Sequence, residues 1–161
     1  MKHFPSVFEG YQEFLLQEVL ESIDDAVIVF GSDHKIAYAN AAAADVFEGH
    51  ADSLTGKSIK HLIPKDQTDY FENIVNQLDS SANHSVELRG KKEFIGLRTN
   101  GRTFYAEGKL AKLKQDLSYI LILRDITWRK VVEDELKTVL GHFNETGQQL
   151  EYRFEHPRFL E

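Results

Sequence analysis

The spacing of apolar residues after residue 85 places the strongest constraint on the fold. From there to residue 126, hydrophobic side chains recur at about every second position in the runs SVELRG, KKEFIGLRT, RTFYAEGKLAKL and LSYILILRDI. A period of two is typical of strands that bury one face. The pair Asn100-Gly101 separates the second run from the third, and both residue types tolerate the positive φ angles of a type I′ hairpin turn. This half of the chain therefore predicts about three antiparallel strands joined by hairpins.

The first half of the chain mixes two short strands with helices. The β-rich runs AVIVF and KIAYAN flank the turn-forming residues 31–34. Helices are predicted over Tyr11–Ile23, over AAAADVF with Asn40 as its N-cap and Glu48-Gly49 as its end, and over Asp66–Leu78, with compact helical turns in SLTGKSIKHLIP. Clustered strands with helices between them indicate an α+β domain with an antiparallel sheet.

Composition limits the classes of function. The chain has 161 residues, 42% of them hydrophobic, which is enough for one domain with its own core. It has no cysteine, so disulfides, thiolate metal sites and thiol nucleophiles are excluded. A net charge of -7 without a long basic cluster argues against direct binding of nucleic acid. No apolar run approaches the roughly 18 residues of a membrane span, and MKHFPSVFEG lacks a signal-peptide core, so we expect a cytoplasmic protein.

No motif in the sequence indicates catalysis. The patterns GxGxxG, GxxxxGK(S/T), GxSxG and HExxH are all absent. The acidic groups Asp24-Asp25 and Glu133–Glu135 are consecutive or lie on a predicted exposed helix face, which is a poor arrangement for general acid–base chemistry. His142 is interpreted as a surface histidine. We therefore expect no catalytic or metal site and no enzyme activity.

The last predicted helix carries a coiled-coil pattern. A 4-3-4-3-4 spacing relates Val132, Leu136, Val139, Phe143, Thr146 and Leu150, and five of these six residues are apolar. Such a spacing forms the a/d seam of nearly three heptads. It predicts a homodimer that associates through the five apolar positions. The alternative is a helix that folds back on its own sheet.

Four segments, taken in order, resemble the PAS domain pattern: AVIVFGSDHKIAYANAAAADVFEG, SLTGKSIKHLIP, GLRTNGRTFYAE and LILRDITWRK. The likeness covers residues 23–130, and Asp125-Ile126-Thr127 resembles the D-I-T motif that ends the last PAS strand. The resemblance implies a five-stranded antiparallel sheet with short helices on one face around a small pocket. It assigns signal transmission between sheet and exit helix to Asp125 and Thr127. Trp128, which follows them, is interpreted as a packing anchor between sheet and helix, with a dimer contact as the alternative.

The resemblance also implies an organisation and a role. Residues 1–22 form an N-terminal amphipathic helix, 23–127 the PAS domain, 128–152 a C-terminal signalling helix, and 153–161 a tail or truncated linker. The expected function is sensing or signal relay within a two-component sensor kinase, a nucleotide cyclase or a transcription regulator, with a downstream effector as partner. A ligand-free protein-interaction module is the first alternative, and a redox or gas sensor with FAD or haem is the second.

The cofactor is a separate question. Cysteinyl-flavin photosensors are excluded because the chain has no cysteine, and DQTDYFENIVNQL has no histidine where haem-binding relatives carry a proximal ligand. His61 lies in the short helical segment from which other haem-binding types take theirs, whereas His84 is interpreted as a loop residue. Noncovalent FAD, a small organic acid or a lipid needs only an apolar cavity with a few polar groups. A filled core without a cofactor is the favoured interpretation. The candidate pocket residues are Ile28, Phe30, Asn40, Phe47, Ile59, His61, Tyr70, Phe71, Ile74, Arg98, Phe104, Ile120 and Ile122.

Overall fold

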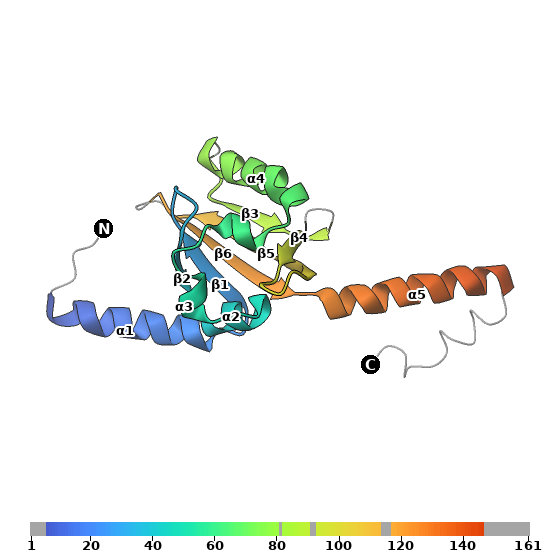
Figure 1. Ribbon diagram of the computed structural model, residues 1–161, viewed down its shortest axis with the longest axis horizontal. Coiled ribbons are helices and arrows are strands. Elements are labelled where there is room, and N and C mark those ends of the chain that lie inside the picture. The colour runs from blue at the N-terminus through green and yellow to red at the C-terminus, as the bar shows by residue number, and fades with distance from the viewer. Residues whose placement is uncertain (1–5, 81, 91–92, 114–116, 147–161) are drawn as a thin grey trace. The chain divides into compact units, whose positions relative to one another are not determined.

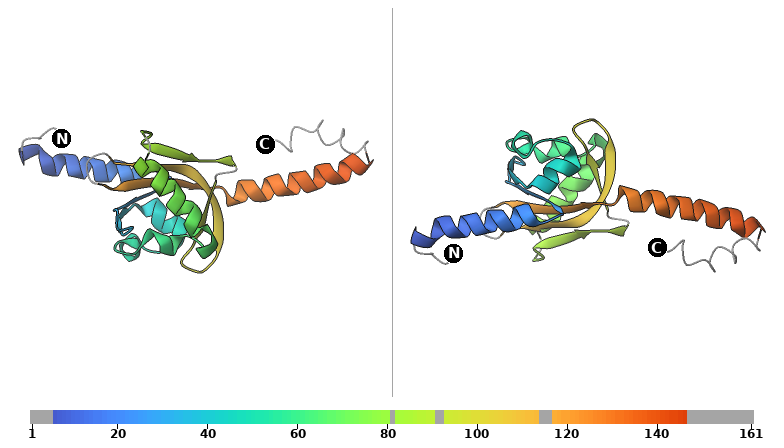
Figure 2. Two further views of the ribbon diagram at one scale, coloured as in Figure 1. Left: turned by 90° about the horizontal axis from the view of Figure 1, so that it is seen from above. Right: turned by 90° about the horizontal axis from the view of Figure 1, so that it is seen from below.

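The computed structural model describes residues 6–80, 82–90, 93–113 and 117–146. Within these ranges the helices are α1 (Ser6–Ser22), α2 (Ala41–Phe47), α3 (Ala51–Leu54), η1 (Ile59–Leu62), η2 (Lys65–Gln67), α4 (Thr68–Ser80) and α5 (Thr127–Thr146), with η marking 3₁₀ turns. The strands are β1 (Ala26–Phe30), β2 (Ile36–Ala39), β3 (Ser85–Leu88), β4 (Phe94–Leu97), β5 (Thr103–Lys112) and β6 (Tyr119–Asp125). Helices α2, α3 and α4 lie over one face of the sheet (Figures 1 and 2).

The chain divides into two units, Met1–Asp125 and Ile126–Glu161, and α5 belongs to the second. Within the described part of the chain, no helix combines the length and the apolar character that crossing a membrane requires. The predicted N-terminal helix is present as α1, and the apolar side chains Phe14, Leu15 and Val19 are exposed on it.

The sheet is antiparallel, with the strand order β2-β1-β6-β5-β3, and β4 also pairs with β5. The α+β class and the antiparallel pairing are confirmed, but the described residues form six strands where five were expected. The extra strand arises because β3 and β4 pair with successive parts of the same edge of β5: Leu88 pairs with Gly108, and Phe94 pairs with Ala106. Between these two partners on β5 lies the single residue Glu107, where the pairing of this edge passes from β4 to β3.

The hairpin between β4 and β5 differs from the predicted type I′ turn. Gly101 has a φ of 87°, but Asn100 is not among the residues with positive φ. The Gly101 N–H donates to the Arg98 carbonyl at 2.9 Å, and the Arg98 N–H donates to the Arg102 carbonyl at 2.8 Å. This pattern is typical of the longer hairpin loop, in which a turn is followed by one left-handed glycine. The two central residues of the turn, Thr99 and Asn100, therefore need no positive φ, and Gly101 after them adopts it.

Strand β5 is strongly curved, as Figure 2 shows, and Gly108 lies in its middle. A Cβ atom at this position would lie 1.7 Å from the carbonyl oxygen of Ile122 on β6. No side chain fits such a close approach of two backbones, so glycine is required here by space. Strand β6 pairs with one edge of β5, and both β3 and β4 pair with the other.

Aromatic rings fill the centre of the core. Phe30 lies 5.8 Å from Phe71 and 5.1 Å from Tyr119, measured between ring centroids, and Phe71 lies 6.3 Å from Phe94. These four rings come from β1, α4, β6 and β4 and are at most 4% exposed. Contacts of this kind join the helices to the inner face of the sheet.

One polar side chain, Asn40, is buried among the described residues, and it is fully hydrogen-bonded. Its Oδ1 accepts from the backbone N–H groups of Val27 and Ala43, both at 2.9 Å. Its Nδ2 donates to the carbonyls of Leu20 at 2.9 Å and Asp25 at 3.0 Å. The predicted N-cap of α2 is therefore confirmed. The same amide also joins the end of α1 and the start of β1 to the cap.

Replacing Asn40 with Ala is expected to lower the free energy of unfolding by about 2–4 kcal/mol, because it removes a helix cap and strands buried backbone groups. Urea denaturation followed by circular dichroism measures the change. The matched control is Asn73→Ala on the exposed face of α4, expected within about 0.5 kcal/mol of the native value. A loss below about 1 kcal/mol for Asn40→Ala would show that the network is dispensable.

Candidate functional site

Arg98, which directly follows β4, makes the densest set of polar contacts near the end of the sheet. Its Nη2 donates to Asp125 Oδ2 at 2.7 Å, its Nη1 donates to the Val46 carbonyl, and its Nε lies 3.9 Å from Glu48 Oε1. The guanidinium also lies 4.4 Å from the centroid of the Phe104 ring. The Arg98 side chain is only 16% exposed, so these interactions are partly shielded from water.

The residues after Arg98 close the C-terminal end of α2. The Thr99 N–H donates to the Phe47 carbonyl at 3.0 Å, and its hydroxyl donates to the Glu48 carbonyl at 2.6 Å. Asn100 Nδ2 donates to Glu48 Oε2. Carbonyls at the end of a helix lack partners within the helix, and the hairpin supplies them here. We call this set the Arg98 clamp: the hairpin residues Arg98, Thr99 and Asn100, the helix-end residues Val46, Phe47 and Glu48, and Asp125 at the end of β6.

The position of Arg98 depends on Gly96 and Phe104. A Cβ atom at Gly96 would lie 2.4 Å from two carbon atoms of the Phe104 ring, so the ring occupies the space that a side chain would need. Phe104 also packs edge-on against Phe47 at a centroid distance of 5.2 Å. The ring is thereby fixed beneath the guanidinium, which favours a defined orientation of Arg98.

Asp125 and Arg98 were predicted in different roles, and the structure brings them together. Asp125 was assigned to signal transmission by resemblance and Arg98 to a ligand pocket. Antiparallel pairing explains the meeting: Leu97 pairs with Thr103 and Asp125 pairs with Ala106, so both charged residues lie near the start of β5, on its two edges. A sequence argument that followed the strand registers could have found this pair.

The two other residues assigned to signal transmission lie in the second unit. Thr127 is the first residue of α5. Trp128 is 79% exposed on α5, and its roles as a packing anchor or as a dimer contact both stay predictions. Of the predicted dimer seam, Val132 and Leu136 are exposed at 40% and 48% on α5 and Val139 is half-buried. The side chain of Phe143 and all of Leu150 lie outside the described residues.

Most of the predicted pocket residues are core residues in contact with one another. Seven apolar ones are at most 5% exposed: Ile28, Phe30, Phe47, Ile59, Phe71, Ile74 and Phe104. A haem or flavin placed among them would overlap packed rings, so the described interior does not fit either group.

Ile120 and Ile122 were wrongly placed on the pocket side of β6. Burial alternates along this strand, and Tyr119, Leu121 and Leu123 are its buried members. Because successive side chains point to opposite faces, the two isoleucines lie on the other face of the sheet, where they are half-buried.

The predicted polar pocket residues are separated by the structure. Asn40 uses both donors and its Oδ1 in the hydrogen bonds described above, which leaves it no part in ligand contact. Tyr70 is half-buried and packs against the core, and burial raises its pKa. His61 and Arg98 line the same open hollow, of about 410 Å³, between η1 and the β4–β5 hairpin.

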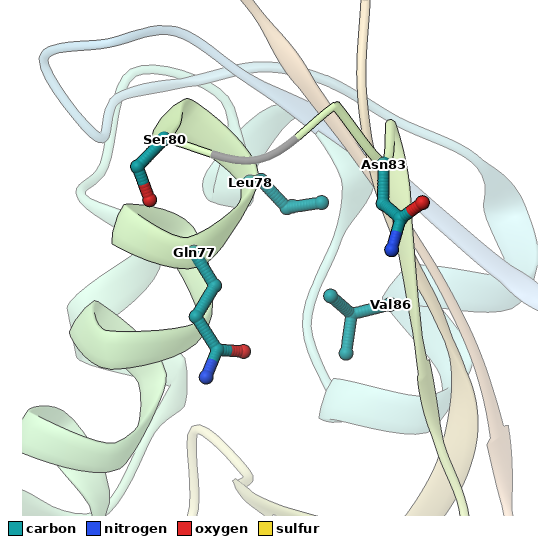
Figure 3. Close-up of a pocket in the computed structure, with 5 residues that line it drawn as sticks. All are labelled: Gln77, Leu78, Ser80, Asn83 and Val86. Atoms are coloured by element: carbon teal, nitrogen blue, oxygen red, sulfur yellow. The ribbon is translucent and has the colours of Figure 1, made fainter.

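Two further hollows lie beside α4. One, of about 290 Å³, is lined by Gln77, Leu78, Ser80, Asn83 and Val86 and carries no charged side chain (Figure 3). The other, of about 320 Å³, is lined by Ser32, His34, Glu72, Val75, Asn76, Asp79 and Tyr119. Among the residues that the structure describes, no group of His, Asp and Glu side chains is arranged to hold a metal ion.

Asp79 is the centre of a polar cluster in the second of these hollows. It accepts hydrogen bonds from the Tyr119 hydroxyl and from Lys112 Nζ, the latter at 2.7 Å. The hydrogen bond from Lys112, followed by that from Tyr119, lowers the pKa of Asp79. Burial, the hydrogen bond to Asp79 and its negative charge raise the pKa of Tyr119 to about 12. The cluster therefore favours an ionised carboxylate beside a neutral phenol.

The fold and these contacts define an α+β domain with one antiparallel sheet, short helices over one face and a helix after the last strand. A family model described as the PAS fold matches residues 15–126. The chain therefore belongs to the PAS family. None of the curated proteins compared with the sequence matches it.

Solved PAS domains have the same fold. The PAS domain of a protein from Colwellia psychrerythraea gives a TM-score of 0.63 at 16% identity, over 72% of this chain and 98% of that one. The PAS domain of a LuxR-family transcriptional regulator from Burkholderia thailandensis, in complex with ethanol, gives 0.58 at 19% identity, over 68% and 96%. The PAS domain of nitrogen regulation protein NR(II) from Vibrio parahaemolyticus gives 0.55 at 20% identity, over 70% and 98%. At these identities the likeness shows the fold alone.

A double-mutant cycle between Arg98→Gln and Asp125→Asn is expected to give a coupling energy of about 1–2 kcal/mol, because the pair is short and partly shielded. Equilibrium urea unfolding of the four proteins measures it. The matched control is the pair Arg124–Asp25, where Arg124 is 67% exposed, and its cycle should give at most about 0.5 kcal/mol. Equal coupling energies in the two cycles would show that the shielding of the Arg98–Asp125 pair does not strengthen it.

Tyr119 is expected to lose its proton near pH 12, whereas an exposed tyrosine does so near pH 10. Its contribution to stability is therefore complete below pH 10 and is lost as the pH rises from 10 through about 12. The difference in tyrosinate absorbance between the native protein and Tyr119→Phe measures the folded value. In Asp79→Asn the midpoint should fall toward 10, since the neighbouring negative charge is gone. Titration of Tyr119 near pH 10 in the native protein would contradict the assignment.

Proposed function

We propose that this chain is a sensory or signal-relay module of a larger signal transduction protein, in which a change in the PAS domain passes through the β6–α5 junction to the C-terminal helix. The Arg98 clamp carries this proposal. It joins the end of α2, the β4–β5 hairpin and the last residue of β6, and α5 begins two residues after Asp125. A shift of α2 or of the hairpin would therefore act on the residue that precedes the exit helix.

The related structures support a role in regulation. A nitrogen regulation protein and a transcriptional regulator both contain PAS domains of this fold. A sensor kinase of a two-component system, a nucleotide cyclase or a transcription regulator in the cytoplasm is accordingly the parent protein that we propose, with its effector as the downstream partner.

The proposed output is a change in a homodimer. Val132 and Leu136 are exposed at the a/d spacing on α5, and exposed apolar residues also line α1. A soluble protein rarely leaves such surfaces uncovered, and a second copy of a helix with the same pattern would cover them. Trp128, at 79% exposure on the same helix, is a further candidate for a dimer contact.

The second candidate is a protein-interaction module that binds no ligand. The packed aromatic core favours this candidate, since seven of the predicted pocket residues are used in packing. In that case the change in the clamp would come from a protein partner instead of a small molecule.

Breaking the clamp should loosen the first turn of α5 without unfolding the domain. In Arg98→Gln, hydrogen–deuterium exchange at residues 130–133, whose N–H groups close the first turn of α5, is expected to accelerate about tenfold, which corresponds to the loss of about 1–2 kcal/mol of coupling. The control Arg102→Gln alters an exposed arginine of the same hairpin and should leave this exchange unchanged. If the double-mutant cycle shows that the Arg98–Asp125 coupling is lost in Arg98→Gln but the exchange at the start of α5 is unchanged, Arg98 stabilises the domain and does not transmit a change to α5.

Introducing charged residues into the predicted dimer seam tests whether α5 associates through it. The double variant Val132→Asp, Leu136→Asp is expected to sediment as a monomer at concentrations at which the native chain is a dimer, because two carboxylates would face their copies across the seam. Lys137→Asp places the same residue off the seam and should remain dimeric. An unchanged sedimentation mass for the double variant would rule out this seam.

A further inference from the structure

The dipeptide Asn100-Gly101 in the β4–β5 hairpin has the composition that most favours loss of a side-chain amide. In this reaction the backbone nitrogen of the following residue attacks the asparagine Cγ, and glycine has no side chain to obstruct the approach. Of the asparagines in the sequence, only Asn100 precedes a glycine. Both residues are exposed, so water reaches them.

The reaction needs water as its only co-reactant. The Gly101 nitrogen loses its proton to hydroxide and forms a bond to Cγ of Asn100. The bond from Cγ to Nδ2 then breaks, and Nδ2 takes a proton from solvent and leaves as ammonia. Water opens the resulting cyclic imide at one of its two carbonyl carbons, which gives aspartate or isoaspartate. A carboxylate thereby replaces a neutral amide.

Hydrogen bonds within the hairpin and to the end of α2 hold the groups that must react. The Gly101 N–H donates to the Arg98 carbonyl at 2.9 Å, so its proton is shielded from hydroxide. Asn100 Oδ1 accepts from the Arg102 N–H at 3.0 Å, and Nδ2 donates to Glu48 Oε2. The Glu48 carboxylate also opposes the negative charge that develops on the glycine nitrogen during the attack. The folded hairpin is therefore expected to slow the reaction.

The product does not fit the contact that the amide makes. Asn100 Nδ2 is a donor, and Glu48 Oε2 is its acceptor. A carboxylate in place of the amide has no proton to donate at neutral pH, so two negative charges would face each other. The preceding residue, Thr99, donates through its N–H and its hydroxyl to carbonyls at the end of α2. Repulsion at Asn100 would thus act on the connection between hairpin and helix.

We propose that Asn100 is a deamidation site that the closed hairpin protects, and that its conversion to a carboxylate separates the β4–β5 hairpin from the end of α2. The change is permanent, because the ammonia is lost to solvent. It removes the helix-end contacts of the Arg98 clamp in those molecules in which the hairpin has opened long enough to react. An effect on α5 rests on the relay proposed above, whereas the chemistry at Asn100 does not.

The rate of deamidation tests the protection. It is measured by incubating the full chain at neutral pH and following the mass of the proteolytic peptide that contains Asn100. The rate is expected to be at least about tenfold lower than in the isolated peptide of residues 96–104, which is too short to hold a stable hairpin. Glu48→Ala should raise the rate in the folded chain at least about threefold, because the opposing charge is gone. The matched control Glu87→Ala removes an exposed carboxylate from β3 and should leave the rate unchanged.

The variant Asn100→Asp reproduces the product and tests the separation. The Thr99 N–H donates to the Phe47 carbonyl at 3.0 Å, so its hydrogen–deuterium exchange reports on the contact between hairpin and helix. This exchange is expected to accelerate about tenfold in Asn100→Asp. Asn73→Asp makes the same change on the exposed face of α4 and should leave it unaltered.

Three outcomes would overturn the proposal: equal rates of deamidation in the folded chain and the peptide, an unchanged rate in Glu48→Ala, or unchanged Thr99 exchange in Asn100→Asp. None of them depends on the relay. The relay fails separately, if exchange at the start of α5 does not respond to Arg98→Gln.

Discussion

The buried amide of Asn40 is the constraint on which the rest of the domain depends. Its position between β2 and α2 lets one side chain bond to backbone groups at the end of α1, at the start of β1 and in the first turn of α2. A buried amide needs all of these partners, because each buried polar group without a hydrogen bond would lower the stability of the folded state, and apolar packing around it does not compensate. The direction in which α2 leaves the sheet is thereby fixed, and the end of α2 is where the Arg98 clamp is built.

Backbone geometry then sets the position of the clamp. Gly108 permits β5 to approach β6 closely, and Gly96 permits the Phe104 ring to lie against the backbone of β4. Gly108 thus permits the close pairing of β5 with β6. Gly96 permits the Phe104 ring to lie under the Arg98 guanidinium. The charged pair at the end of the sheet is consequently held by a preformed surface, which limits the entropy lost when Arg98 is ordered.

Sequence periodicity predicted the elements better than it predicted the site. The period of two after residue 85, the Asn40 cap and the α+β class followed from local pattern, and the structure contains them. Ile120 and Ile122 were assigned to the wrong face of β6. The strand is apolar at every position from Tyr119 to Leu123, and such a sequence does not show which of the two alternating sets of side chains faces the core. The Arg98–Asp125 pair joins two different strand ends, so predicting it requires the registers of β4 with β5 and of β5 with β6 in addition to the strands themselves.

The interruption between β3 and β4 has a consequence for how this domain can vary. Each of the two strands has its own partners on β5, Ser85–Leu88 with Gly108–Ala111 and Phe94–Leu97 with Thr103–Ala106. The registers are therefore independent, and the number of residues that connect the strands is not fixed by either of them. Insertions after the exposed residue Gly90 would therefore leave both ladders paired. The connection between β3 and β4 thus offers evolution, or an engineer, a place to graft a new recognition loop without disturbing the hairpin that carries Arg98.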